Sequence, residues 1–83
     1  MKTVIFLHHP VLNDTFAYFP LEKWDRMGNR KCYGIDGMGA CSQDYAAECD
    51  DATEEQHKGI HAILVGAGFS LKILLKNDLI KSK

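Results

Sequence analysis

The stretch TVIFLHHPVLNDTFAYFP, Thr3 to Pro20, carries the strongest fold signal in this 83-residue chain. It contains two runs of β-branched and aromatic residues, Thr3–His8 and Thr15–Phe19, a composition typical of β-strands. Pro10 and Pro20 are predicted to end the two runs, because proline cannot donate a hydrogen bond to a strand ladder. The link between the runs ends in Asn-Asp, which favours a turn. The two runs are therefore predicted to form a hairpin, although their apolar residues leave its register open.

Helix signals dominate the second half of the chain. Ser42 is a good N-cap for a helix of about two turns over Gln43–Cys49, which the acidic pair after it would end. The sequence TEEQ, Thr53 to Gln56, is a capping box, so a longer helix is predicted from there to about Ala67. Gly68 is placed for a left-handed C-cap. In this helix the apolar residues recur at helical spacing, which predicts one buried stripe: Ile60, Ile63, Leu64 and Ala67.

Two further strands complete the predicted fold. Lys31–Ile35 is predicted as the third strand, after a loop over Leu21–Arg30 in which Trp24 folds back over the core. Ser70–Lys76 alternates apolar and polar residues and is predicted as the last strand, followed by a frayed polar tail at 77–83. The order strand-strand-strand-helix-helix-strand predicts an α+β fold in one domain, 1–83. It would be a small two-layer sandwich with a three- to four-stranded, mostly antiparallel sheet and one main helix packed on it.

Composition narrows the classes of function. The formal net charge is −1, which argues against binding to a nucleic-acid backbone. The N-terminal apolar run is too short for a signal peptide, and no stretch approaches the roughly 20 apolar residues of a membrane span. Cys32, Cys41 and Cys49 are an odd number without repeated spacing, which indicates free thiols in a reducing compartment. We therefore expect a cytoplasmic protein.

The stretch GIDGMGACSQDY, Gly34 to Tyr45, is the candidate ligand site. Glycines ahead of a helix can present backbone amides to an anion, so Gly37, Gly39 and Ser42 are candidate ligand-binding residues. Tyr33, directly before this stretch, and Tyr45, its last residue, join them as candidates because of their aromatic rings. The stretch lacks the Gly-Lys-Ser/Thr ending of a phosphate-binding P-loop. The alternative is a turn in which Gly37 and Gly39 adopt positive φ, followed by an ordinary capped helix.

Metal binding and catalysis are less favoured. His57 and His61 share a helix face and are weak candidates for a metal pair, but Lys58 stands where a metalloprotease carries glutamate. The cysteines lack the close spacing of structural zinc sites. Cys41, just ahead of a helix, is a candidate for a lowered pKa, yet the sequence places no histidine beside it. The expectation is a protein without a metal or cofactor that is not an enzyme.

The pattern KCYGIDGMGACSQDYAAECDDATEEQHKGIHAILVGAGFSLKILLKN resembles a family of short uncharacterised proteins carried by bacteriophages and prophages. Their hosts are gut Bacteroidetes and some Firmicutes. The resemblance covers most of the chain and is carried by Cys32-Tyr33, Ser42, Asp44-Tyr45, Ala52–Glu55, Gly68-Phe69, Leu71–Ile73 and Phe16–Pro20. The loop Ile35 to Ser42 departs from the family pattern, in which a histidine and a glutamine are usual. No established activity comes with the family, but the resemblance implies a phage accessory protein.

Three functions follow as hypotheses. The first is a non-catalytic accessory protein that binds a host protein through an exposed edge strand or the acidic segment, with counter-defence as one use. The second is a homo-oligomeric sponge that sequesters a small anionic ligand such as a signalling nucleotide, because an interface can enclose what one thin domain cannot. The third is a thiol or metal-dependent enzyme. A homo-oligomer is favoured in the first two, since a short domain gains stability by burying another face.

Overall fold

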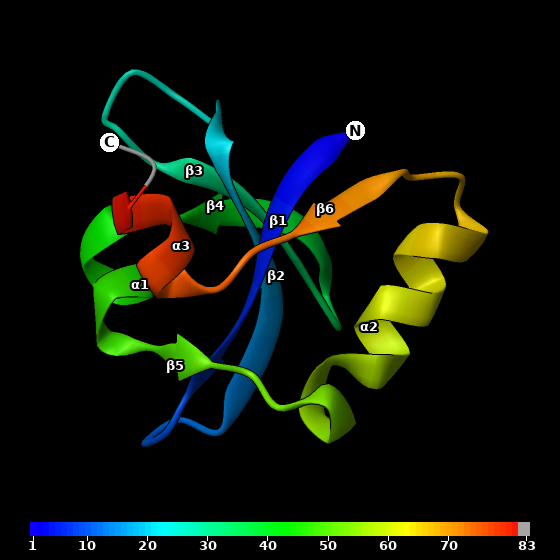
Figure 1. The fold of residues 1–83 in the computed structure, drawn as a ribbon. Helices are drawn as coiled ribbons and strands as arrows, with labels where there is room; N and C mark the ends of the chain where they lie inside the picture. Colours follow the sequence, from blue (N-terminus) through cyan, green and yellow to red (C-terminus); the bar gives the residue numbers. More distant parts are fainter. Residues whose placement is uncertain (82–83) are drawn as a thin grey trace.

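The computed structural model describes residues 1–81 of the chain, with side chains up to Asp78, as a curved sheet that carries helices on both faces (Figure 1). The strands are β1 (Lys2–His9), β2 (Asp14–Lys23), β3 (Arg30–Gly34), β4 (Gly37–Cys41), β5 (Asp50–Asp51) and β6 (Leu71–Ile73). The helices are α1 (Gln43–Glu48), α2 (Glu54–Gly66) and α3 (Lys76–Lys81). The α+β class is confirmed, but six strands and three helices in the described part replace the expected three to four strands and one main helix.

The sheet runs in the order β4-β3-β2-β1-β5, with β6 also on β1. The predicted hairpin forms between β1 and β2, and its register pairs Ile5 with Tyr18 and Leu7 with Phe16. The outer edge of β1 is covered twice. β6 pairs parallel with its first half and β5 pairs antiparallel with its second half. At the opposite end of the sheet, β4 pairs with β3.

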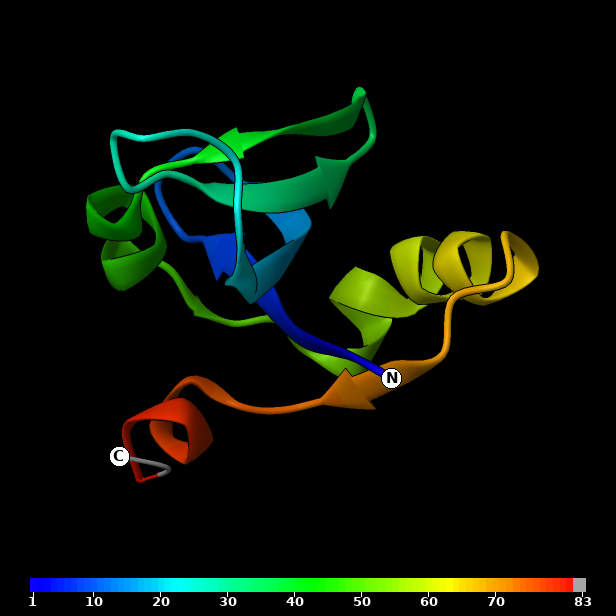
Figure 2. The same ribbon diagram turned by 90° about the horizontal axis from the view of Figure 1, so that it is seen from above.

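Alternate residues of the central strands build two separate cores, one on each face of the sheet. The first cluster packs around α1 and consists of Ile5, Leu7, Phe16, Tyr18, Cys41, Ala46 and Cys49. The second packs against α2 and consists of Val4, Phe6, Ala17, Phe19 and Leu64. We call these the α1 face and the α2 face. Figure 2 shows α1 and α2 well apart, at different sides of the sheet. Because both faces are apolar, β1 and β2 read as continuous apolar runs.

The predicted N-caps are present. The Ser42 side chain accepts a hydrogen bond from the Tyr45 amide, and Thr53 and Gln56 form both bonds of the capping box at the start of α2. Gly68 has φ +96°, which confirms the left-handed C-cap. The buried stripe of α2 differs from the prediction, because the residues turned toward the sheet are His57, Ile60, His61 and Leu64, whereas Ile63 and Ala67 are exposed.

Two predictions around the second strand are wrong. β2 continues through Pro20 to Lys23, because the pairing with β3 is irregular between Phe19 and Lys23 and an irregular ladder tolerates a residue without an N–H. Trp24 does not cover the core, since 47% of its surface is exposed. The loop from Trp24 to Asn29 is stabilised by its own polar groups, with Asp25 accepting hydrogen bonds from Met27 and Asn29.

The C-terminal prediction also needs correction. The last strand, β6, covers only Leu71–Ile73, and α3 begins at Lys76, where a polar tail was expected. The predicted alternation fails because Leu71 and Leu74 pack toward the core, while Ile73 and Leu75 are exposed. Residues 82–83 of the predicted tail lie outside the described residues. Within the described part of the chain, no helix combines the length and apolarity needed to cross a membrane.

Candidate functional site

The glycine stretch forms a β-hairpin and not an amide nest. Gly34 pairs with Gly37 across a turn made by Ile35 and Asp36, and the strand β4 follows directly. Gly37 has φ +99°, so the positive φ expected there is confirmed. Gly39 does not have the positive φ predicted for it, so that part of the prediction is wrong. Gly39 is an ordinary strand residue that pairs with Cys32, so its amide belongs to a strand and not to a loop before the helix.

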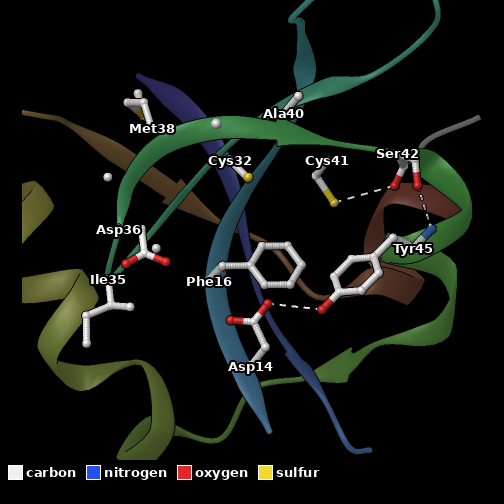
Figure 3. Close-up of a pocket in the computed structure, with 13 residues that line it drawn as sticks. Asp14, Phe16, Cys32, Ile35, Asp36, Met38, Ala40, Cys41, Ser42 and Tyr45 are labelled. Carbon is white, nitrogen blue, oxygen red and sulfur yellow. Dashed lines mark hydrogen bonds between the residues drawn. The ribbon is translucent and has the colours of Figure 1, made fainter. Parts of the chain in front are cut away.

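A pocket of about 500 Å³ opens beside this hairpin on the α1 face of the sheet (Figure 3). We call it the hairpin pocket. Its walls come from the start of β2, the β3–β4 hairpin and the first turn of α1. The lining residues are Asp14, Phe16, Cys32, Gly34, Ile35, Asp36, Gly37, Met38, Gly39, Ala40, Cys41, Ser42 and Tyr45. Its volume lies within the range of small-molecule and side-chain pockets.

Tyr45 organises one wall of the hairpin pocket. Its hydroxyl donates a hydrogen bond of 3.0 Å to Asp14 Oδ2, and its ring lies 5.8 Å from that of Phe16 (Figure 3). The ring of His9 stacks on Tyr45 at 5.0 Å. Burial and the hydrogen bond to Asp14 raise the pKa of Tyr45 to about 12. The phenol therefore stays protonated over the physiological range and keeps donating to Asp14.

The structure brings four of the five predicted ligand residues together. Gly37, Gly39, Ser42 and Tyr45 all line the hairpin pocket. Tyr33 does not, because it is on the opposite face and packs with the α2 cluster. The hydroxyl of Ser42 is occupied as the cap of α1, where it accepts from the Tyr45 amide at 3.0 Å. Ligand binding by these residues stays a prediction.

The charge of the pocket is the opposite of what an anion needs. Asp14 and Asp36 supply two carboxylates, and none of the described lining residues is Lys, Arg or His. These two residues and Phe16 were not among the sequence-derived candidates. One sequence signal included Asp36: residues 32–57 contain seven Asp or Glu residues and no Lys or Arg. Asp14 lies outside that segment, and only the fold places it beside Asp36.

The thiols are not activated. Cys41 and Cys49 are buried, and Cys32 is half-buried. Burial raises the pKa of all three thiols, and it raises that of Cys41 to about 12. The lowered pKa expected for Cys41 is therefore wrong, since burial outweighs the adjacent helix start. These cysteines act as small apolar side chains of the α1 face.

The two helix histidines pack against the core. His57 stacks on the Phe6 ring at 4.3 Å, and the His61 ring lies 5.5 Å from the same ring. Their own ring centres are 6.1 Å apart. His57 Nδ1 is buried and has no hydrogen-bond partner among the described residues. No group of three or more His, Cys, Asp or Glu side chains in the described part of the chain is arranged to hold a metal ion.

Comparisons with known proteins identify no relative of this chain. No protein-family model, curated protein or solved structure matches the chain. The fold class is thus defined by the structure itself, and the candidate function depends on the geometry of the hairpin pocket and its surroundings.

Proposed function

We propose that this chain is a non-catalytic binding module that takes up an extended segment of a partner protein along β4. The phage resemblance would make that partner a host protein, the working compartment the host cytoplasm, and counter-defence one use. The observation that carries the proposal is the difference between the two edges of the sheet. An edge strand presents a row of N–H and C=O groups to which another chain can add a strand.

At the end of the sheet away from β4, the edge strands are β5 and β6, which are only two and three residues long and both pair with β1. The Lys2 amide donates to Ser70 O at 2.8 Å, the Leu74 amide to Val4 O at 2.9 Å, and the Ala52 amide to Phe6 O at 2.8 Å. The edge at β4 offers a longer row of backbone groups, because β4 has five residues and, among the described residues, pairs with β3 alone. Its side chains are small or flexible, and 46% of Met38 is exposed. An incoming strand would meet neither a bulky nor a charged side chain on β4.

The sponge for a small anion is the second candidate, and the pocket gives it less support. Asp14 and Asp36 would repel an anion, and the described lining offers no cation to offset them. A sponge would need cationic side chains from a second copy at this site. Native mass spectrometry of the untagged protein separates the candidates, since a sponge predicts an oligomer that carries a releasable nucleotide-sized ligand.

A peptide-display selection tests the proposal directly. Random heptapeptides are selected on the full-length protein, and the enriched peptides are remade with N-methyl groups on alternate backbone amides. If the peptide adds as a strand, methylation in one alternating register removes the amides that face β4 and abolishes binding, whereas the other register retains it. Hydrogen exchange should then show new protection at alternate amides of β4.

The control is a substitution on the opposite face. Val65→Lys changes an exposed apolar residue of α2, so it should leave peptide affinity unchanged. Binding that is indifferent to the register of N-methylation, or that Val65→Lys abolishes, would contradict docking at β4. A selection in which no peptide is enriched over an unrelated control protein would contradict it as well.

A further inference from the structure

The hairpin pocket lies directly against the open β4 edge. β4 itself supplies five of the lining residues, Gly37 to Cys41, and Figure 3 shows this strand passing along one side of the hollow. A segment added to β4 would place every second side chain on the α1 face of the sheet, because side chains alternate along a strand. One of those side chains would stand at the mouth of the pocket.

Two carboxylates in the pocket have unused acceptor capacity. Asp14 receives the Tyr45 hydroxyl on Oδ2, and among the described residues nothing donates to its Oδ1. Asp36, at the hairpin turn, makes no hydrogen bond or ion pair with any described residue. Glu22 provides the contrast, because its carboxylate is held by Lys2 at 2.9 Å and Lys31 at 3.4 Å. Asp14 and Asp36 are both exposed and, unlike Glu22, have no cationic partner among the described residues.

The rest of the wall suits a flat cationic group with an apolar stem. Phe16 is 3% exposed and forms the floor of the pocket, so the accessible aromatic ring is that of the half-buried Tyr45, and aromatic rings attract cations over their faces. A guanidinium is planar, stacks on aromatic rings and donates two parallel hydrogen bonds to a carboxylate. An ammonium group is a compact, strongly hydrated charge that lacks the planar fork. The charge, the shape and the aromatic lining of the pocket therefore all favour an arginine side chain.

We propose that the hairpin pocket is a recognition subsite for one arginine side chain of the extended segment bound at β4. This inference rests on the proposed function, since β4 pairing delivers the arginine to the pocket. Asp14 and Asp36 bind the guanidinium, and the ring of Tyr45 contacts the side chain. The module would then distinguish partners by an arginine at one position of the segment, while the strand pairing supplies affinity without regard to sequence.

The first test uses a probe that needs no strand pairing. Acetyl-arginine-methylamide is titrated into isotope-labelled protein and followed by NMR, with the neutral isostere acetyl-citrulline-methylamide as the matched ligand. We expect arginine to shift the resonances of Asp14, Asp36 and Tyr45, and citrulline to bind about tenfold or more weakly, because charge-assisted hydrogen bonds are lost. Equal binding of the two ligands, or arginine shifts confined to residues outside the pocket, would overturn the subsite.

Substitutions in the protein test which carboxylates bind the guanidinium. Asp14→Asn and Asp36→Asn each keep shape but remove a carboxylate, and each should weaken arginine binding about three- to tenfold. Asp14→Asn retains an oxygen that can accept the Tyr45 hydroxyl, so the wall stays in place. Asp44→Asn is the control, because Asp44 is in the first turn of α1 and does not line the pocket. If Asp44→Asn weakens binding as much as the other two, the effect is long-range charge and the subsite is wrong.

The failures of the two proposals are distinguishable. Peptides that pair with β4 but bind equally well with arginine or citrulline at every position overturn the subsite and leave the β4 proposal standing. Arginine binding in the pocket without any peptide whose affinity depends on the N-methyl register overturns the β4 proposal and leaves a free-standing guanidinium site.

Discussion

The two faces of the sheet are built from residues of the same two strands, β1 and β2, but helices cover them to different extents. The α2 face is covered by a helix of thirteen residues, and Phe6, Phe19 and Leu64 form a closed core there. The α1 face receives a helix of six residues that covers one end with Ala46 and leaves the hairpin pocket beyond it. The longer helix thus closes its apolar face of the sheet into core, whereas the shorter helix leaves a pocket on the other face.

Thiol chemistry gives the largest expected contrast. Burial raises the pKa of Cys41 to about 12 from an ordinary 9.0. At about pH 8 its thiolate population is therefore about a thousandfold smaller than that of an ordinary cysteine. We expect iodoacetamide to alkylate native Cys41 slower than the denatured chain by a factor of that order, as measured by peptide mass spectrometry.

The raised pKa of Cys41 also makes the stability of the protein depend on pH. The native state keeps the proton of Cys41 more tightly than the unfolded state, so the free energy of unfolding should fall as pH rises from 9 toward 12. Cys41→Ser should make the free energy of unfolding less dependent on pH between 9 and 12. In the alkylation experiment, the half-buried Cys32 serves as the control. Alkylation of Cys41 at the same rate in the native and denatured chains would mean that the α1 end of this face is open.

Truncation of the helix core tests the closed face. Leu64→Ala removes a side chain that is 2% exposed, and we expect a loss of about 2–5 kcal/mol in the free energy of unfolding. Ile63→Ala is the matched control, because Ile63 is 55% exposed in the same helix and should cost less than about 1 kcal/mol. Urea unfolding followed by circular dichroism measures both. Equal losses would contradict the placement of Leu64 in the core and of Ile63 at the surface.

The start of α2 gives a smaller effect. Thr53→Ala removes the side-chain oxygen that accepts from the Gln56 amide at 3.2 Å, and we expect a loss of about 1 kcal/mol. Thr53→Ser should restore most of it, since the hydroxyl is kept. If alanine and serine behave alike in urea unfolding, the capping bond contributes nothing to stability.

The smallest effects are expected at exposed positions. Trp24→Ala should change the free energy of unfolding by no more than about 0.5 kcal/mol, because Trp24 lies in the exposed β2–β3 loop and not over the core. Asp14→Asn should be similarly mild in stability while it weakens arginine binding. A large loss for Trp24→Ala in the same urea experiment would restore the covering role that its sequence first suggested.

Local signals predicted the β1–β2 hairpin and the helices α1 and α2 but missed β4, β5 and α3, and non-local packing explains the errors. The two apolar runs gave the β1–β2 hairpin, and the capping residues located both predicted helices. The stripe of α2 was misjudged because His57 and His61 stack on Phe6 in place of Ile63 and Ala67. Hydrophobicity alone ranks isoleucine above histidine, but an aromatic ring can pack flat on another ring. The glycine stretch was misjudged because three glycines favour a loop, whereas pairing with β3 makes it a strand.

The sequence by itself determined the α+β class, the β1–β2 hairpin and the starts of α1 and α2, because the hairpin and the two caps depend on residues a few positions apart. The tertiary structure decided which residues come together at the candidate site. Tyr45 bonds to Asp14 across 31 positions of the chain, and the carboxylate of Asp36 joins the same pocket from a different hairpin. The sign of the pocket's charge and the opening of the β4 edge depend on which strands become neighbours. The strands become neighbours because this arrangement buries both apolar faces of the sheet, and a local sequence pattern does not specify that arrangement.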